Sequence, residues 1–155
     1  MPLTLTTDVV HGFTESLLKS RFDNPQPTPD FHKELWEHCC SSEPWVALAA
    51  PRGHAKSTAV THAFTLALIL FRERSFGMII SDTEGQASNF LADIAMEFRD
   101  NERLKELFGF KQFLVDNSTE IQLEFTDGWK CCLLAKGSGQ KVRGTKWLNK
   151  RPDFV

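Results

Sequence analysis

The chain has 155 residues, of which 41% are hydrophobic and 25% charged, as in an ordinary globular domain. Disorder, collagen and low-complexity sequence are therefore excluded as descriptions of the whole chain. The 18 Lys and Arg and the 20 Asp and Glu residues leave a formal net charge of −2, so a contact with nucleic acid would need a local basic patch rather than bulk charge.

The cysteines and the N-terminal residues indicate a cytosol-like compartment. The four cysteines occur as the pairs Cys39-Cys40 and Cys131-Cys132, which resemble neither a disulfide framework nor a CxxC metal site. Reduced thiols are therefore expected. No basic stretch followed by an apolar one opens the chain, so no signal peptide is expected. The longest apolar-rich run, 63–71, is too short to cross a bilayer.

The first 29 residues predict a helix followed by a stiff connector. Apolar residues recur near one face over 8–22, and Thr7 or Asp8 stands before them as a candidate cap. The prolines of 23–29 cannot donate backbone hydrogen bonds, so the helix has to end there.

A second helix is expected over 30–40. Thr28 followed by Pro29 is typical of a helix start, because the hydroxyl can cap and the missing proline N–H costs nothing in the first turn. The helix would bury Phe31, Leu35 and Trp36.

The middle of the chain predicts alternating strands and helices. The short apolar run Trp45–Ala50 suits a strand that is covered on both faces, as in a parallel sheet. After a break at 51–55, the segment 56–74 is apolar almost all round and predicts a buried helix. Residues 76–80 form a second buried strand. This order favours an α/β layered fold with a parallel sheet.

The next helix has the clearest pattern in the chain. It follows the polar residues Ser81–Thr83, and Thr83 with Gln86 has the spacing of a capping box. Its apolar residues recur at i, i+3, i+4, i+7 and i+11, at Ala87, Phe90, Leu91, Ile94 and Phe98.

The last third of the chain predicts an antiparallel hairpin attached to the sheet. Apolar and polar residues alternate over 121–125, Asp127-Gly128 is a turn signal, and a second strand-like run covers 129–135. A flexible loop at 137–140 follows. Residues 151–155 have the pattern of the start of another buried strand, cut off after two apolar residues.

The segment Ala50–Thr58 is the strongest candidate site. It stands between a predicted buried strand and a helix, where backbone amides and a helix N-terminus converge on an anion. Lys56 supplies a mobile positive charge for β- and γ-phosphates, and Ser57 can place a hydroxyl on Mg²⁺. The alternative is a surface Lys-Ser-Thr that starts a helix, which the order of the elements disfavours.

The loop departs from the usual phosphate-binding pattern at two positions. The spacing matches GxxxxGK[ST], but Ala50 and Ala55 occupy both glycine positions, and Gly53 supplies one permissive position. Arg52 has two interpretations of similar weight, a guanidinium that reaches the γ-phosphate and a solvated loop arginine. His54 either shapes the loop or contacts phosphate, although a lone histidine is usually neither ligand nor base.

The loop Ala50–Thr58 resembles the variant Walker A loop of large terminase subunits from tailed bacteriophages. Its sequence is Ala-Pro-Arg-Gly-His-Ala-Lys-Ser-Thr. These are ATP-driven motors that package DNA into proheads. The resemblance covers Thr28 to Val155. Weaker matches follow in the family's order. Residues 81–90 resemble its second strand and polar helix start, and 127–128 resemble its hairpin turn. Residues 141–144 resemble its Arg-Gly loop, and 151–155 the lead-in to Walker B.

The resemblance implies an ASCE-type P-loop NTPase fold, a three-layer αβα sandwich with a mainly parallel sheet and an added antiparallel hairpin. Residues 1–29 would be an N-terminal helix and connector, and 30–155 the N-terminal part of the ATPase domain. The chain would stop before the Walker B strand is complete, without the Walker B acids and the ribonuclease H-like nuclease domain. An N-terminal fragment or an interrupted reading frame is therefore expected.

The family implies ATP and Mg²⁺ as cofactors. The nucleotide would be held by Pro51, Arg52, Gly53, His54, Ala55, Lys56, Ser57 and Thr58. Lys56, Arg52 and Arg143 would be catalytic, and Ser57 would bind Mg²⁺. The alternative interpretation of Arg143 is a loop charge that contacts only solvent. The chain alone is expected to bind nucleotide weakly and to hydrolyse it little, because the water-activating acid is missing.

Several other residues have two interpretations each. Ser81, Thr83 and Gln86 either face the γ-phosphate or, as favoured, cap a helix. Related ATPases hold adenine in a region like that of Gln26, Phe31 and Trp36, although a core role for the two aromatic residues is favoured. A zinc site is disfavoured for His32, His38, Cys39 and Cys40. A basic tail that could meet DNA phosphates or remain solvated comprises Lys141, Arg143, Lys146, Lys150 and Arg151.

The partners implied by the family are double-stranded DNA, a portal protein and a small terminase subunit, with a homo-oligomeric ring and no membrane. The expected location is the host cell cytoplasm, and transiently the portal vertex of the prohead, without secretion. Two alternatives stay open: another P-loop ATPase of the helicase-like or AAA type, and a nucleotide-independent fragment that interacts with a motor partner.

Overall fold

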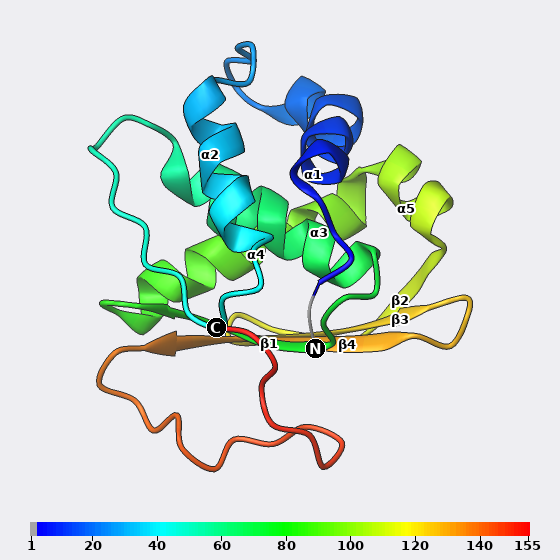
Figure 1. The fold of residues 1–155 in the computed structure, drawn as a ribbon. Coiled ribbons are helices and arrows are strands. Elements are labelled where there is room, and N and C mark those ends of the chain that lie inside the picture. The colour runs from blue at the N-terminus through cyan, green and yellow to red at the C-terminus, as the bar shows by residue number, and fades with distance from the viewer. Residues whose placement is uncertain (1–2) are drawn as a thin grey trace. The chain divides into compact units, whose positions relative to one another are not determined.

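The computed structural model describes residues 3–155 of the chain. The chain forms two compact units, Met1–Glu73 and Arg74–Val155. In its described residues the first unit is built from helices and loops, and the second contains an open four-stranded sheet (Figure 1). The chain is therefore of the mixed α/β class, as the order of its predicted elements indicates. Within residues 3–155 no helix has both the length and the apolar character that a membrane crossing needs.

The predicted first helix is present, and its cap lies one residue earlier than expected. Thr6 has extended backbone angles, and its hydroxyl accepts a hydrogen bond from the Val9 N–H, so it takes the role expected of Thr7 or Asp8. The helical stretch consists of an α-helical, a π-helical and a 3₁₀ part, α1 (Thr7–Phe13), η1 (Thr14–Leu18) and η2 (Lys19–Arg21).

The second helix, α2 (Asp30–Cys39), is confirmed, but the expected cap at Thr28 is wrong. The Thr28 hydroxyl donates to the Glu15 carboxylate instead, and Pro29 precedes the helix without a side-chain cap. A carboxylate is the stronger acceptor, which explains why this contact wins. Hydrogen bonds from Lys19 and then from Thr28 lower the pKa of Glu15 to about 2. The N-terminal helix and the connector are thereby tied together.

Helix α2 packs through its predicted apolar face. Leu35 and Trp36 are buried, whereas Phe31 is only half-buried. The Trp36 indole Nε1 donates to the Ala59 carbonyl at 2.9 Å, which satisfies the polar atom of an otherwise apolar ring. This hydrogen bond connects α2 to the next helix.

The predicted buried helix after the loop is confirmed from Lys56 to Leu70. It has a π-helical part, η3 (Thr58–Phe64), and an α-helical part, α3 (Thr65–Leu70), and every residue of α3 is buried. The helix ends before the expected Arg74 because Arg72 adopts a positive φ of 63°, which a right-handed helix cannot accommodate.

The strand expected at Trp45–Ala50 is absent, and this prediction is wrong. The segment has no strand pairing, and the Trp45 side chain is 87% exposed. A strand needs a neighbour to satisfy its backbone N–H and C=O groups. The described residues of the unit Met1–Glu73 contain no other strand that could pair with it. An apolar run is therefore not sufficient to form a strand here.

The second unit begins with the predicted strand and then the predicted amphipathic helix. Its elements are β1 (Phe76–Ser81), α4 (Glu84–Asp100), α5 (Glu102–Phe108), β2 (Phe110–Asp116), β3 (Glu120–Phe125) and β4 (Lys130–Gly137). The Thr83 hydroxyl accepts from the Gln86 N–H at 3.2 Å, so the predicted cap of α4 is confirmed. Of the predicted apolar face, Phe90 is half-buried, and the buried residues are Ala87, Leu91, Ile94 and Phe98.

The sheet has the order β1-β4-β3-β2, and the prediction of a mainly parallel sheet is wrong. Only β1 and β4 pair in parallel, while β4 with β3 and β3 with β2 are antiparallel. Tight turns join both antiparallel pairs, and a tight turn can connect only antiparallel neighbours. The Asp127-Gly128 turn of the predicted hairpin is confirmed, with Gly128 at a φ of +84°.

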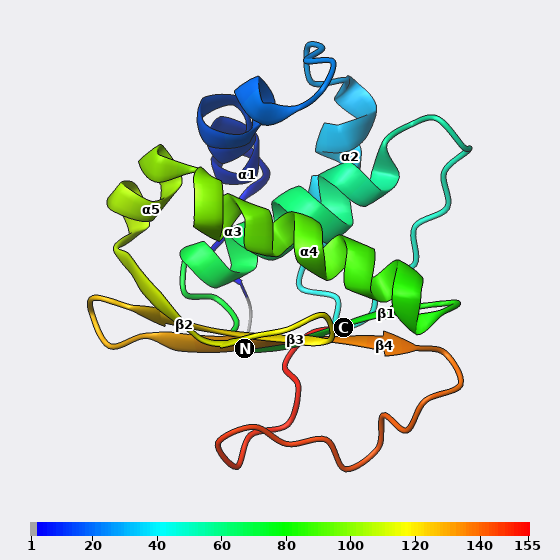
Figure 2. The ribbon, with the colours of Figure 1, turned by 180° about the vertical axis from the view of Figure 1, so that it is seen from behind.

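The two faces of the sheet are covered differently. Helix α4 lies over one face, and the segment 138–152 passes below the other, as Figures 1 and 2 show. On that second face Val142 and Trp147 pack against a small apolar cluster, which consists of Phe76, Met78, Cys132 and Leu134. The Asp153 carboxylate then accepts hydrogen bonds from the backbone of Ser75 and Phe76, and Phe154 forms a parallel bridge with Gly77.

Candidate functional site

The candidate loop connects the unpaired segment 45–50 to the buried helix. Gly53 has a φ of +84°, as its predicted permissive role requires, and Ala55 has a φ of +50°. Ala55 is the residue that stands at the second glycine position of the GxxxxGK[ST] spacing. Its backbone therefore adopts a conformation that glycine reaches without strain and alanine reaches at a cost of about 1 kcal/mol.

The backbone N–H groups at the end of this loop have no partner among residues 3–155. Those of Ala55, Lys56 and Ser57 donate no hydrogen bond to a described group, because the helix begins at Lys56 and its first turn has no preceding carbonyls. Unsatisfied N–H groups and the positive end of the helix dipole both favour an anion.

The side chains of the loop add positive charge and one hydroxyl. Lys56 is half-buried, and Arg52 and Ser57 are exposed. None of the three makes a side-chain hydrogen bond or ion pair within the described part of the chain. Two cations without a counter-ion therefore stand beside three free N–H donors, which suits a polyanion such as a phosphate chain.

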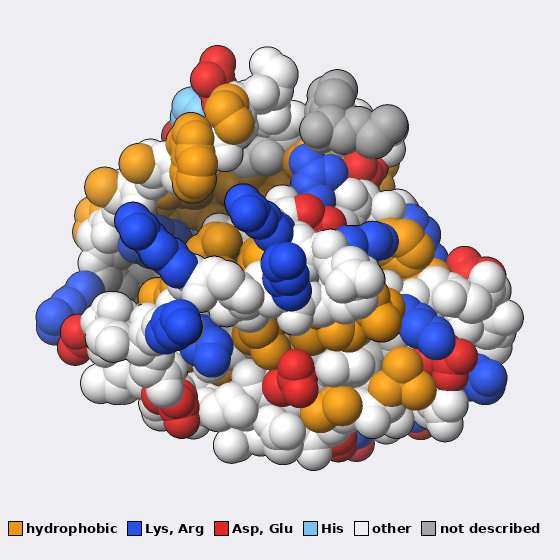
Figure 3. Space-filling model, turned by 90° about the horizontal axis from the view of Figure 1, so that it is seen from below, with side chains coloured by type: hydrophobic (Ala, Val, Ile, Leu, Met, Phe, Trp, Pro, Cys, Tyr) orange, Lys and Arg blue, Asp and Glu red, His pale blue; other side chains and the backbone are white. Residues whose placement is uncertain are grey.

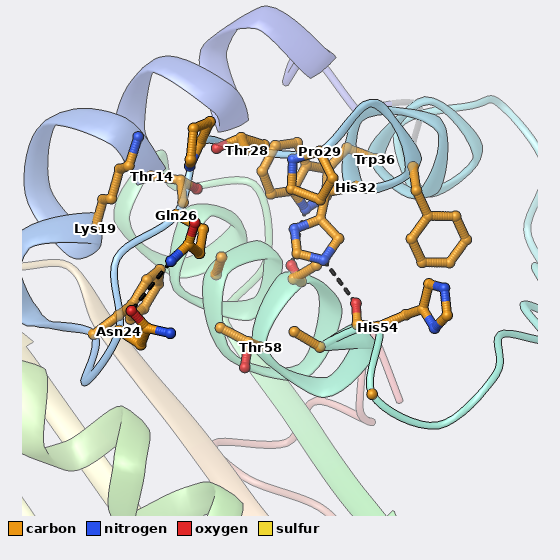
Figure 4. A pocket seen from close by; sticks show the side chains of 17 residues that line it. Thr14, Lys19, Asn24, Gln26, Thr28, Pro29, His32, Trp36, His54 and Thr58 are labelled. Carbon is orange, nitrogen blue, oxygen red and sulfur yellow. Dashed lines mark hydrogen bonds between the residues drawn. The ribbon is translucent and has the colours of Figure 1, made fainter.

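His54 is held by helix α2 from two sides. Its carbonyl oxygen lies 2.9 Å from Nε2 of His32, and its imidazole packs edge-on against the Phe31 ring at 5.6 Å between centroids (Figure 4). The Nδ1 atom of His54 also lies 3.3 Å from the Arg52 carbonyl oxygen. The middle of the loop is thus held by a contact within the loop and by two contacts with α2.

A cavity of about 380 Å³ adjoins the loop, and Figure 4 shows the side chains around it. It is bounded by the connector, by α2 and by the first turns of the helix after the loop. The polar side chains on the connector side include Asn24, Gln26 and Thr28. Gln26 Nε2 donates to Asn24 Oδ1 at 3.1 Å. The volume is within the usual range for small-molecule sites.

The aromatic residues expected near the loop divide into two roles. Trp36 is fully buried and belongs to the core, as favoured. Phe31 is half-buried and lines the cavity, together with the exposed Gln26. Thr58 also lines this space, while its exposed neighbour Ser57 is not among the lining residues.

The remaining predicted site residues belong to the unit Arg74–Val155. Arg143 is exposed and precedes Gly144, which has a φ of +80°. Ser81, Thr83 and Gln86 are joined by hydrogen bonds at the start of α4, as the helix-cap interpretation predicts.

A basic surface extends over residues 136–151, a stretch that contains no Asp or Glu. Its cations are exposed apart from the half-buried Lys136, and in the described structure none of them forms an ion pair. They are Lys136, Lys141, Arg143, Lys146, Lys150 and Arg151. Figure 3 views the molecule from below, the side on which this segment lies, and shows Lys and Arg side chains spread across that face with some Asp and Glu side chains among them.

The residues of the loop include one candidate metal ligand and several anion donors. No group of three or more His, Cys, Asp or Glu side chains among residues 3–155 could hold a metal ion. Mg²⁺ usually takes only one or two protein ligands together with substrate phosphates, and the Ser57 hydroxyl can be such a ligand. The loop donors suit the phosphates themselves.

Sequence reasoning did not identify the role of His32 or the cavity. His32 stands one helical turn before Trp36, and no motif marks it as a partner of a residue 22 positions later. The connector residues around the cavity have the composition of an ordinary turn.

Comparisons with protein-family models, with curated proteins and with solved structures found no match for this chain. The candidate site therefore rests on its own residues and geometry.

Proposed function

We propose that this chain is the ATP-binding part of a viral DNA-packaging motor, the large terminase subunit of a tailed bacteriophage. In the complete protein, ATP hydrolysis would drive double-stranded DNA into the prohead. One observation carries the proposal: a Walker A-like loop with a positive φ at Ala55 presents three free N–H groups beside an unpaired Lys56. The resemblance of Ala50–Thr58 to the terminase loop supplies the assignment to a motor.

Each loop residue has a distinct task under this proposal. The N–H groups of Ala55, Lys56 and Ser57 would donate to phosphate oxygens, and the Lys56 ammonium would neutralise charge on the β- and γ-phosphates. The Ser57 hydroxyl would bind Mg²⁺. Arg52 is exposed and unpaired, so its guanidinium is available to stabilise charge at the γ-phosphate. The bound Mg-ATP supplies the phosphoryl group whose transfer to water drives the motor.

The adenine base would occupy the cavity beside the loop. The cavity begins at Gly53–Ala55 and extends to the connector, so a base bound there would be continuous with phosphates on the loop. The Phe31 ring offers an apolar contact, and the Gln26 and Asn24 amides offer hydrogen-bond donors and acceptors. This arrangement supports a nucleotide rather than a simple phosphate ion.

The P-loop NTPase fold is part of the same proposal. Strand β1 has a parallel neighbour in β4 and a parallel bridge to Phe154 on its other side. Parallel neighbours on both sides of a strand are typical of α/β nucleotide-binding sheets. Under the proposal, residues 151–155 lead into the Walker B strand of the complete ATPase domain.

The basic surface 136–151 would contact DNA phosphates in the assembled motor. The six cations form no ion pair among the described residues and belong to a stretch without Asp or Glu, which suits contact with a phosphate backbone. Such contacts are independent of sequence, as translocation requires. Arg143 would reach a phosphate or a neighbouring subunit of a homo-oligomeric ring. The portal protein and the small terminase subunit are the other proposed partners, in the host cytoplasm and at the prohead vertex.

Calorimetric titration with Mg-ATP tests the proposal. We expect weak binding to the wild-type chain, and roughly tenfold to hundredfold weaker binding to Lys56→Ala, because a charge-assisted contact is lost. Lys33→Ala is the matched control, since Lys33 pairs with Asp30 on α2 and lies outside the loop. We also expect little ATP turnover by the chain alone. No binding to a chain shown to be folded would contradict the proposal and favour a nucleotide-independent interaction fragment.

The DNA downstream of codon 155 separates the terminase from other P-loop ATPases. An apolar strand with two acids, followed by a nuclease region with clustered acids, would support the packaging motor. Helicase or AAA-type motifs in that region would contradict it and leave only nucleotide binding in place.

A further inference from the structure

We propose that His32 is a positioning residue for the phosphate-binding loop, because it holds the His54 carbonyl and thereby orients the Ala55 N–H toward the bound phosphate. This inference rests on the proposed function and adds a residue outside the loop to its machinery. It begins with one contact, the 2.9 Å separation of His32 Nε2 from the His54 carbonyl oxygen (Figure 4).

The chemistry of this contact determines which imidazole nitrogen carries the proton. A carbonyl oxygen can only accept a hydrogen bond, so His32 Nε2 has to be the donor. The neutral ring of His32 is therefore the Nε2–H tautomer, and Nδ1 is left unprotonated. The tautomer of His32 is a direct spectroscopic signature of the contact.

The orientation of the Ala55 N–H follows from peptide geometry. The His54 carbonyl and the Ala55 N–H belong to one planar peptide, and no cis peptide occurs among the described residues. In a trans peptide these two groups point in opposite directions. Holding the oxygen toward α2 therefore turns the Ala55 N–H away from α2, where it meets no described acceptor.

The conformation of Ala55 explains why the loop needs such a contact. Alanine at a φ of +50° is in a sparsely populated region, and such residues persist only where their surroundings hold them. A glycine at this position would need less support. The His32 contact acts on the peptide directly before Ala55, so it is well placed to maintain this conformation.

The His32 ring also packs against a buried aromatic residue. Its ring lies 6.1 Å from the fully buried Trp36 ring, and Trp36 donates to the Ala59 carbonyl in the helix after the loop. The preceding residue, Phe31, packs against the His54 imidazole. Two consecutive residues of α2 therefore hold both the main chain and the side chain of His54.

The test uses two variants and one matched control. His32→Leu removes the donor and keeps an apolar side chain, while His32→Gln keeps an N–H donor at similar reach. His11→Leu is the control, because His11 also lies against Trp36, at 6.3 Å, and pairs with Glu15 rather than with the loop. Affinity for Mg-ATP is measured by calorimetry, and thermal melting of each variant reports folding.

We expect His32→Leu to weaken Mg-ATP binding roughly fivefold to tenfold, the factor that corresponds to one ordinary hydrogen bond. The Mg-ATP affinity of His32→Gln and of His11→Leu should stay within about twofold of the wild-type value. Glutamine restores the hydrogen-bond donor, and His11 does not contact the loop. A purely structural role would not distinguish Gln from Leu in this way.

Nitrogen-15 NMR of the chain without nucleotide gives an independent readout. We expect the Nε2–H tautomer of His32 in the wild type, and a displaced Ala55 amide signal in His32→Leu but not in His32→Gln. An Nδ1–H tautomer would overturn the proposal. So would an unchanged Ala55 signal, or an unchanged ATP affinity, in a folded His32→Leu.

The two proposals can fail separately. If the wild-type chain does not bind Mg-ATP, the proposed function is overturned, and the NMR readout still decides whether His32 orients the Ala55 N–H. If Lys56→Ala loses binding and a folded His32→Leu does not, only the role of His32 is overturned. If His32→Leu does not fold, the wild-type tautomer and the Gln variant decide the outcome.

Discussion

The tip of the Phe154 ring occupies the space where a side chain on Gly77 would stand. A Cβ atom on Gly77 would lie 2.1 Å from Cζ of Phe154, closer than two carbon atoms can approach. Beside this contact the Met78 N–H donates to the Phe154 carbonyl at 3.1 Å, and the Asp153 N–H donates to the Phe76 carbonyl at 2.8 Å. The C-terminal segment therefore docks on β1 as a strand does, and it requires glycine at position 77.

Gly77→Ala is expected to destabilise the chain by about 1–3 kcal/mol, because either the ring or the strand has to move. Gly85→Ala is the control, since Gly85 is exposed in the first turn of α4 with nothing near its Cβ position. The control should be neutral or stabilising by up to about 1 kcal/mol. Urea unfolding measures both, and a Gly77→Ala chain as stable as the wild type would show that Phe154 is not docked.

The lowered pKa of Glu15 predicts that the folded chain loses stability in acid. Its pKa is lowered from 4.5 to about 2 by Lys19 and then by Thr28, so its contribution to folding is complete above pH 4.5 and disappears as the pH falls toward 2. Glu15→Gln should cost about 1 kcal/mol at pH 7, a value that allows for solvent screening of a partly exposed group. Thermal melting of wild type and variant should converge near pH 2, and an equal difference at both pH values would contradict this.

Three thiols are expected to react slowly in the folded chain. Burial raises the pKa of Cys39 and Cys40 to about 11, and burial followed by the nearby Glu120 raises the pKa of Cys132 to about 12. A pKa near 11 lowers the thiolate fraction about a hundredfold relative to an ordinary thiol. A thiol reagent at pH 8 should label these residues rapidly only after urea is added. Rapid labelling of the folded chain would show that the thiols are solvated.

Replacing the strained alanine should stabilise the loop. Ala55→Gly removes the cost of a positive φ and is expected to raise the free energy of unfolding by about 0.5–1 kcal/mol. Ala92→Gly is the opposite control, because position 92 is an exposed interior position of α4, where the same change costs about 1 kcal/mol. Urea unfolding of both variants gives the comparison, and a destabilised Ala55→Gly chain would contradict the left-handed conformation.

Sequence reasoning succeeded where local interactions decide the structure. The cap of α4 at Thr83, the apolar face of that helix and the Asp127-Gly128 turn all depend on residues within a few positions of one another. The helix that begins at Lys56 follows from a continuous apolar run. In such segments the side chains that select the conformation are already neighbours in the sequence.

Strand β2 was not predicted from the sequence, and its pairing shows one reason why. Its register with β3 shifts between Phe110 and Gln112 and again between Phe113 and Val115, so its side chains do not alternate as a regular strand requires. The run Trp45–Ala50 shows the opposite case, an apolar pattern without a partner strand. In both segments the pattern of apolar residues is a poor guide to pairing.

The candidate site combines both kinds of information. The order Lys56-Ser57 at the start of an apolar helix and the permissive Gly53 are readable in the amino-acid order. The left-handed Ala55 is not, because alanine by itself favours negative φ. The contact between His32 and His54 is equally invisible, since it joins residues of α2 and the loop that only folding brings together.

The amino-acid order by itself determined the helices that cover 7–21, 30–39, 56–70 and 84–100, the hairpin and the position of the candidate loop, because capping, apolar periodicity and turn chemistry act over a few residues. Only the tertiary structure decided which strands pair, that Thr28 binds Glu15 instead of capping α2, and how His32 holds the loop. A hydroxyl, a backbone carbonyl or a strand edge can be satisfied by many partners. Which partner is available depends on the packing of distant segments.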